Sequence, residues 1–308
     1  MRPTFADPKT DFAFKRIFGT EAHKSVLIAL LNDLLARDEA HTITDVKYLS
    51  EEQRPVVPEL KASIVDVKCQ SADGTQFVVE MQVLNVEGFE KRVVYNTSKA
   101  YVRQLESGDK YAELHDVIGI SICDFQLWPE QEGEIHVPLV SRWRMREEHG
   151  GRMGLSQVQY VFVELPKFAM SAVPATAIEQ WAYFFRHAQE LKAVPTVLTN
   201  EGPLAALDVA KTTRFTESEW DQYDRALMAE QDVRGALSLV QRVARAEGRE
   251  EGREEGAIGT ARSLLLRLLS VRFRCNGDPR VDQCADLGTL ALWIERTVTA
   301  VTLDDVFA

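Results

Sequence analysis

The sequence predicts an α/β protein, with strands and helices over residues 1–240 and a helical segment after them. Three observations lead to this prediction. Residues 63–82 alternate in the manner of two strands joined by a tight turn. Residues 87–107 have a helical pattern, and the apolar run 116–124 after them is short enough for one buried strand. A strand, a helix and a buried strand in this order are typical of a β-α-β crossover.

Other elements follow from periodicity and turn residues. The aromatic side chains at 180–191 are more typical of a core than of a binding platform. Thr216 and Glu219 have the spacing of a capping box, which predicts the start of a further helix. The elements are a helix or helix pair at 10–36, a strand at 44–49, a loop at 51–59, a strand at 158–165 and a helix at 180–191.

The hairpin places two carboxylates opposite each other. Its turn falls at residues 72–74, with Gly74 at the position that requires a left-handed backbone. With this loop, Asp66 faces Glu80, and two carboxylates in that arrangement repel each other. A cation between them would remove the repulsion. The second strand has a core face and a second face, the latter shared with Asp66: Phe77, Val79, Met81 and Val83 on the first, and Val78, Glu80 and Gln82 on the second.

Composition limits the class of protein. Lys and Arg number 36 against 47 Asp and Glu, a net charge of −11, so contact with nucleic acid must be local. Residues 1–10 contain no apolar signal segment and no run approaches the length of a membrane span, which predicts a cytoplasmic protein without membrane association. The cysteines are scattered, so neither a disulfide framework nor a zinc site is expected: Cys69, Cys123, Cys275 and Cys284.

The composition changes at residue 245. Residues 247–256 repeat Gly-Arg-Glu-Glu, which predicts a solvated helix with Glu–Arg pairs, weakened by its glycines. Leucine-rich stretches at 264–273 and 290–301 predict two more helices, which could join two copies of the chain into a homo-oligomer. The predicted domains are a core at 1–240, a charged spacer helix at 241–260 and a small helical domain at 261–308.

A series of short motifs resembles one protein family. Asp66, a short turn and Glu80-x-Gln82 are similar to the active-site signature of PD-(D/E)XK nucleases, and more narrowly of the Rpn family of recombination-promoting nucleases, also described as transposases. The resemblance covers about residues 1–230 and implies a restriction-endonuclease-like mixed sheet flanked by helices. The other matching motifs are Asp7-Pro-Lys-Thr-Asp11-Phe-Ala-Phe-Lys15, Leu30-Leu-Asn32, Arg92-x-x-Tyr95, Gln104-Leu-x-x-Gly108-x-x-Tyr111 and Phe162-Val-Glu164-Leu-Pro-Lys167-Phe168.

The resemblance implies a Mg²⁺-dependent DNA endonuclease, with Mn²⁺ as a substitute metal, tied to DNA recombination or mobile elements. Asp66 and Glu80 would bind the metal together with the backbone carbonyl of Met81, because Mg²⁺ takes hard oxygen ligands. Gln82 would position the attacking water, and Arg92 would engage phosphate or orient the strand.

Gln82 departs from the wider superfamily, where a lysine usually follows the glutamate by two residues. Glutamine can hold a water but brings no positive charge. Lys68, two residues after Asp66, could supply that charge. The substitution and the net charge of −11 leave a second interpretation open. In this interpretation the chain is a catalytically silent nuclease-fold protein that binds DNA or assists assembly.

Two further features also leave alternatives open. Arg92, Lys99 and Arg103 share one helical face. They either bind nucleic-acid phosphates or form a solvated face that pairs with neighbouring glutamates, and the resemblance favours phosphate binding for Arg92 alone. Asp11 is either a metal ligand or an acid at a helix N-terminus, where carboxylates are favourable.

Overall fold

The chain forms two compact units, which we describe separately: Met1–Gln231 and Asp232–Ala308. The predicted boundaries at residues 240 and 260 stay predictions. The structure is a computed structural model and describes residues 2–37, 39–53, 63–130, 136–152, 154–170, 172–275 and 277–307.

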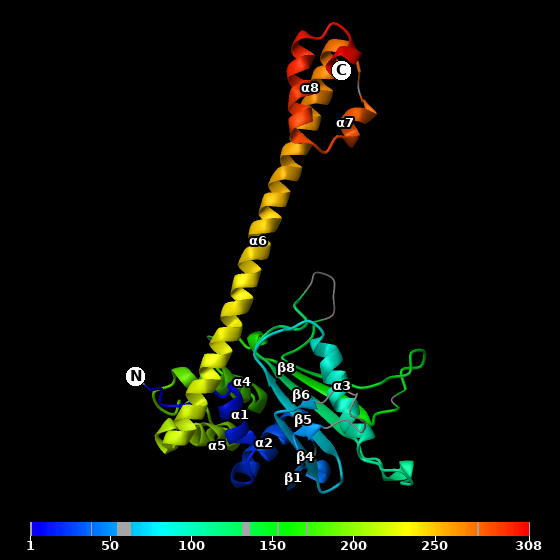
Figure 1. Ribbon diagram of the computed structural model, residues 1–308. Helices are drawn as coiled ribbons and strands as arrows, with labels where there is room; N and C mark the ends of the chain where they lie inside the picture. Colours follow the sequence, from blue (N-terminus) through cyan, green and yellow to red (C-terminus); the bar gives the residue numbers. More distant parts are fainter. Residues whose placement is uncertain are drawn as a thin grey trace. The chain divides into compact units, whose positions relative to one another are not determined.

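The first unit is built on a six-stranded mixed sheet in the order β1-β4-β5-β6-β8-β7 (Figure 1). Strands β5, β6 and β8 are parallel, whereas β1, β4 and β7 join antiparallel to their neighbours. The predicted α/β class with a mixed sheet is therefore confirmed. The strands are β1 (Val46–Tyr48), β4 (Val67–Ser71), β5 (Gln76–Gln82), β6 (Val117–Cys123), β7 (Val140–Trp143) and β8 (Val158–Glu164).

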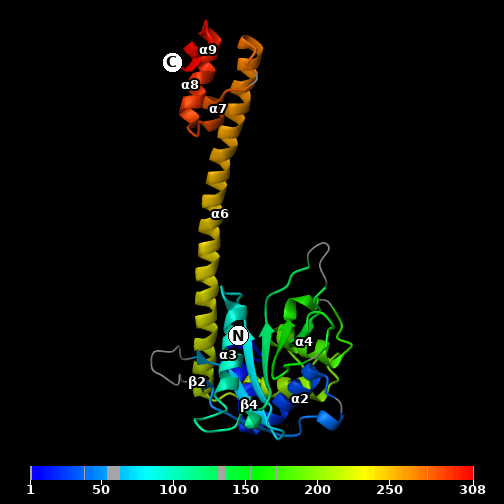
Figure 2. The same cartoon turned by 90° about the vertical axis from the view of Figure 1, so that its right-hand side faces the viewer.

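Helices cover both faces of this sheet (Figure 2). One face packs against α1, α2, α4 and α5 in the main hydrophobic core, and α3 covers the other face. These helices are α1 (Asp11–Phe18), α2 (Lys24–Leu35), α3 (Phe89–Val102), α4 (Ala177–His187) and α5 (Glu201–Val209). Short 3₁₀ helices connect the elements: η1 (Glu21–His23), η2 (Glu39–His41), η3 (Tyr111–Glu113), η4 (Leu165–Lys167), η5 (Ala188–Glu190) and η6 (Thr212–Arg214).

The predicted crossover is confirmed. β5 leads through α3 into β6, which is buried over its whole length and runs parallel to β5. α3 runs from Phe89 to Val102, which is shorter than the predicted 87–107 at both ends. The elements β7 and α5 were not predicted.

The predicted first strand of the hairpin is divided. Residues 63–64 form β3 (Ser63–Ile64), which pairs with β2 (Glu52–Gln53) in a separate two-stranded sheet. The prediction of a loop at 51–59 was therefore wrong for residues 52–53, which form β2. Residues 54–59 lie outside the described residues. A two-residue pairing leaves no periodicity for sequence reasoning to detect. The chain bends at Asp66 and enters β4, whose register with β5 is the predicted one, with Val67 opposite Val79.

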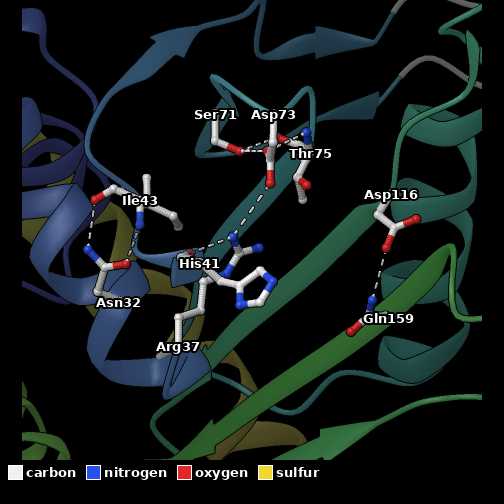
Figure 3. A network of polar contacts seen from close by, with 9 residues as sticks. All are labelled: Asn32, Arg37, His41, Ile43, Ser71, Asp73, Thr75, Asp116 and Gln159. Atoms are coloured by element: carbon white, nitrogen blue, oxygen red, sulfur yellow. Dashed lines mark hydrogen bonds and ion pairs between the residues drawn. The ribbon is translucent and has the colours of Figure 1, made fainter. Parts of the chain in front are cut away.

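The turn of the hairpin has the predicted geometry. Gly74 has a φ of 87°, and the Ser71 N–H donates to the Thr75 carbonyl at 2.9 Å. The Asp73 carboxylate accepts bonds from the Ser71 hydroxyl at 2.5 Å and from the Thr75 N–H at 3.0 Å. Figure 3 shows this turn together with Arg37, whose guanidinium lies 3.7 Å from Asp73. The turn is therefore held by its own hydrogen bonds and contacts Arg37, two residues after the end of α2.

Gly74→Ala is expected to lower the free energy of unfolding by about 1–3 kcal/mol, because the left-handed backbone is strained for alanine. A Cβ at this position would also lie 2.2 Å from His115 Nδ1. Gly88→Ala is the control, since Gly88 has a φ of 76° but nothing within 4 Å of its Cβ position. Urea unfolding should show the larger loss for Gly74→Ala. Equal losses would mean that contact with His115 has no effect.

The second unit is helical. Its long helix α6 (Glu217–Phe273) begins in the first unit, at the predicted capping box, where the Thr216 N–H donates to Glu219 at 2.8 Å. From Asp232 on, α6 belongs to the second unit, and it stays helical through the charged repeat. Residues 264–273 are helical as predicted, but they are the end of α6 and not a separate helix. The helix predicted at 290–301 is α8, which runs from Leu287 to Thr299. The unit has its own small core, formed by Leu265, Leu269, Val281, Leu290, Ala300 and Val306. Its other helices are α7 (Pro279–Gln283), α8 (Leu287–Thr299) and α9 (Leu303–Phe307). Among the described residues, none of the helices is both long and apolar enough to span a membrane.

Candidate active site

The two carboxylates of the hairpin lie together at its open end. Asp66 sits at the bend before β4, one residue beyond the ladder, where the register places it opposite Glu80 of β5. Asp66 Oδ2 accepts the Met81 N–H at 2.7 Å. Glu80 Oε1 accepts from the side-chain amide of Asn96, on α3, at 2.9 Å. The strand and the helix therefore hold one oxygen of each carboxylate in place.

Both carboxylates are poorly solvated. Burial raises the pKa of Asp66 to about 7; the Met81 N–H opposes this rise, and the charge of Glu80 adds to it. Burial also raises the pKa of Glu80, which is 5% exposed, against the opposing effects of the Asn96 hydrogen bond and the Arg92 charge. A divalent cation would favour the ionised form of both groups.

A cation from α1 lies beside this pair. Lys15 Nζ is 2.9 Å from Asp11 and 4.0 Å from Glu51, and its charge lowers the pKa of Asp66. A positive charge of the kind that the sequence suggested for Lys68 is therefore supplied by Lys15 of α1. The signal for Lys15 was its place in the first matching motif.

Lys68 has a different environment. It is buried, and its pKa is lowered first by burial and then by the charge of Arg103. Lys99 of α3 donates to the Ser63 hydroxyl at 3.4 Å, and its pKa is lowered first by desolvation and then by the charge of Arg103. The predicted basic stripe is thus divided: Arg92 lies with the carboxylates, and Lys99 and Arg103 lie near Lys68.

Arg92 and Gln82 form one unit. The guanidinium of Arg92 donates to Gln82 Oε1, so the side-chain oxygen of Gln82 is held by α3. Within the described part of the chain, Arg92 Nε and Asn96 Oδ1 are buried without a hydrogen-bond partner. Buried polar atoms without a partner cost about 1–3 kcal/mol each. One donor and one acceptor beside the two carboxylates are therefore available to a ligand. Asn96, which sequence reasoning missed, lies one helical turn after Arg92.

Asp11 lies where a helix N-terminal acid is expected. It is the first residue of α1, after the N-cap Thr10, and it pairs with Lys15 one turn later. Its charge also raises the pKa of Asp66, so it belongs to the surroundings of the carboxylate pair.

The oxygen atoms around the carboxylate pair are suitable ligands for a hard cation. The Gln82 carbonyl accepts from Asp124 next to β6, whereas the Met81 N–H points to Asp66. The N–H and C=O of one strand residue leave the strand on the same side, so the Met81 carbonyl also faces the side of Asp66. Among the described residues, no three His, Cys, Asp or Glu side chains form a group that could hold a metal. A metal here would depend on two carboxylates, a carbonyl, water and substrate, as is usual for Mg²⁺.

A mixed sheet flanked by helices, with paired carboxylates at the end of a hairpin, is consistent with a restriction-endonuclease-like nuclease. A family model described as PD-(D/E)XK nuclease family transposase matches residues 8–239. The chain belongs to this family, which confirms the resemblance seen in its motifs. No curated protein and no solved structure shows significant similarity to it.

Proposed function

We propose that the protein is a metal-dependent endonuclease that hydrolyses phosphodiester bonds in DNA and acts in recombination or in the movement of genetic elements. The observation that carries this proposal is the Asp66–Glu80 pair at the end of the hairpin, with Glu80 buried, Asp66 partly buried and a raised pKa at both carboxyls. Membership of a nuclease family supports the reaction class. We propose Mg²⁺ as the metal, with Mn²⁺ as a substitute.

In this proposal, Asp66, Glu80 and the Met81 carbonyl hold the metal. A bound divalent ion supplies a Lewis acid that polarises the phosphate and lowers the pKa of water. The chain orients the ligands: the Met81 N–H fixes one oxygen of Asp66, and Asn96 fixes one oxygen of Glu80.

The remaining groups act on water and phosphate. Gln82 is held through its oxygen by Arg92, which leaves its NH₂ group as a donor for the attacking water. The buried Nε of Arg92 can donate to a phosphate oxygen by a charge-assisted hydrogen bond. Lys15 adds positive charge near Asp66. Lys99 and Arg103 would contact DNA further along α3.

A cytoplasmic location and a homo-oligomer formed through the C-terminal helices are also part of the proposal. Light scattering on the full chain and on a chain that ends before Arg245 tests the oligomer. If both chains form particles with the same number of subunits, the C-terminal helices are excluded as the assembly element.

Mn²⁺ titration by calorimetry tests the metal site directly. At pH 8 we expect one binding site, which is lost in Asp66→Asn and Glu80→Gln. Between pH 8 and pH 6 the affinity should fall about tenfold, because protons compete for a carboxylate whose pKa is about 7. Glu90→Gln, on the exposed side of α3, is the control and should bind like the wild type. Absence of binding by the wild type would favour the catalytically silent alternative.

A further inference from the structure

The edge strand β7 differs in charge from the rest of the chain. Residues 142–152 contain four arginines and two glutamates, in a protein whose net charge is −11. β7 is the last strand of the sheet order, next to β8. Trp143 at its end is 40% exposed, and Met145 after it is 57% exposed. The exposed ring of Trp143 therefore lies between two arginines, Arg142 and Arg144, at the end of an edge strand.

The strand register assigns different roles to these side chains. Trp143 pairs with Tyr160 of β8, on the sheet face that α3 covers. Arg142 turns to the other face, where it donates two hydrogen bonds to the carbonyl of Leu34 at 2.6 and 3.0 Å. Arg142 therefore supports the fold. Arg144 and Arg146 follow the strand and are exposed, so they can meet a ligand.

A row of rings runs from Trp143 toward the candidate active site. The centroid of Trp143 lies 4.7 Å from that of Trp128, and Trp128 lies 4.9 Å from Phe162. Phe162 lies 6.4 Å from Phe89 of α3, and the Arg92 guanidinium lies 5.6 Å from the Phe89 ring. The exposed edge and Arg92 are thus connected by a continuous row of packed rings, of which Phe162 and Phe89 are buried.

The two indoles are held in place. The backbone N–H of Trp128 donates to the fully buried carboxylate of Glu164 at 3.1 Å, and the indole ring packs against Phe162. Lys167 Nζ lies 2.7 Å from the other oxygen of Glu164, so the carboxylate is itself fixed. Trp143 Nε1 donates to the Ser141 hydroxyl at 2.9 Å. Rings that are already ordered lose little conformational entropy when a base stacks on them.

We propose that β7 and the residues after it bind single-stranded DNA. Unpaired bases stack on Trp143, and phosphates contact Arg144 and Arg146. A single strand fits this surface better than a duplex, because every base of a single strand can expose a π-face, whereas duplex bases stack on each other. The part of the inference that leads the strand toward Asp66 and Glu80 rests on the proposed nuclease function. It would make single-stranded DNA the preferred substrate.

The test is fluorescence anisotropy with the full chain, in EDTA so that no cleavage occurs. The probes are a labelled oligothymidylate of about 20 nucleotides and a duplex of the same length. We expect tighter binding of the single strand and about tenfold weaker binding in Trp143→Ala, with most of the affinity retained in Trp143→Phe. The control is Tyr111→Ala, which removes another exposed aromatic and should change nothing.

A charge variant keeps the test valid if Trp143→Ala fails to fold. Arg144→Glu changes only an exposed side chain, and it should weaken binding and flatten its salt dependence. Equal binding of single strand and duplex, no binding of either, or equal losses in Trp143→Ala and Tyr111→Ala would overturn the inference.

The outcomes also separate this inference from the proposed function. Normal binding by Trp143→Ala and Arg144→Glu, alongside cleavage that requires Asp66, would reject the β7 surface and leave the nuclease intact. If the two variants bind DNA more weakly and the wild type does not cleave DNA, the nuclease function is rejected and the β7 surface is supported.

Discussion

Asp66→Asn is expected to lower the Mg²⁺- or Mn²⁺-dependent cleavage of DNA by about 100-fold or more, because it removes a charged metal ligand from the reacting centre. The asparagine keeps an oxygen that can accept the Met81 N–H, so the fold should persist. Glu80→Gln should have an effect of similar size, since Asn96 can still hold its side-chain oxygen. The measurement is the rate of nicking of supercoiled plasmid and of cleavage of single-stranded DNA.

Matched purification decides how this result is interpreted. Glu90→Gln should cleave at the wild-type rate, because Glu90 is an exposed carboxylate of α3 that is not among the groups acting on the pKa of Asp66 or Glu80. Activity that survives in both Asp66→Asn and Glu80→Gln would point to a contaminating nuclease. A wild type that cleaves under neither metal would favour a nuclease fold that has lost its activity.

Glu164→Ala is expected to lower the free energy of unfolding by about 3–5 kcal/mol, the cost of breaking a buried ion pair by removing one partner. Glu164 is fully buried and its carboxylate accepts the N–H groups of Leu127 and Trp128, at 2.7 and 3.1 Å, and Lys167 Nζ at 2.7 Å. Its removal leaves the buried Lys167 ammonium with a hydrogen bond to the Val137 carbonyl but without its carboxylate. Urea unfolding followed by circular dichroism measures the loss.

An exposed ion pair provides the comparison. Lys211 and Asp208 are also three residues apart with Nζ and Oδ1 at 2.7 Å, but both side chains are partly exposed. Asp208→Ala should therefore cost less than about 1 kcal/mol. If the two variants lost equal stability, the burial of Glu164 would not be the source of its contribution.

Much of the hairpin was predictable from the sequence. Gly74 fixed the turn and the turn fixed the register, so the placement of Asp66 opposite Glu80 followed from neighbouring residues. The crossover to β6 followed equally well, since a helical pattern and a wholly apolar run are local signals. The capping box at Thr216 needed only the spacing of two residues.

The surroundings of the carboxylate pair were not predictable in the same way. Lys15 acts on Asp66 only because α1 packs against the sheet, and Asn96 reaches Glu80 only because α3 covers the opposite face. Lys68 has the right spacing from Asp66, but β4 places it under α3 near Arg103. Packing between segments that are distant in the sequence decides such contacts, and the periodicity of each segment does not predict this packing.

The sequence by itself determined the fold class, the hairpin register and the pair Asp66–Glu80, because these depend on alternation and turn chemistry within about 20 residues. Only the tertiary structure decided which charges surround that pair and that Trp143 ends an exposed edge strand beside Trp128. The physical reason is that burial and the resulting pKa shifts depend on which elements meet in the folded chain.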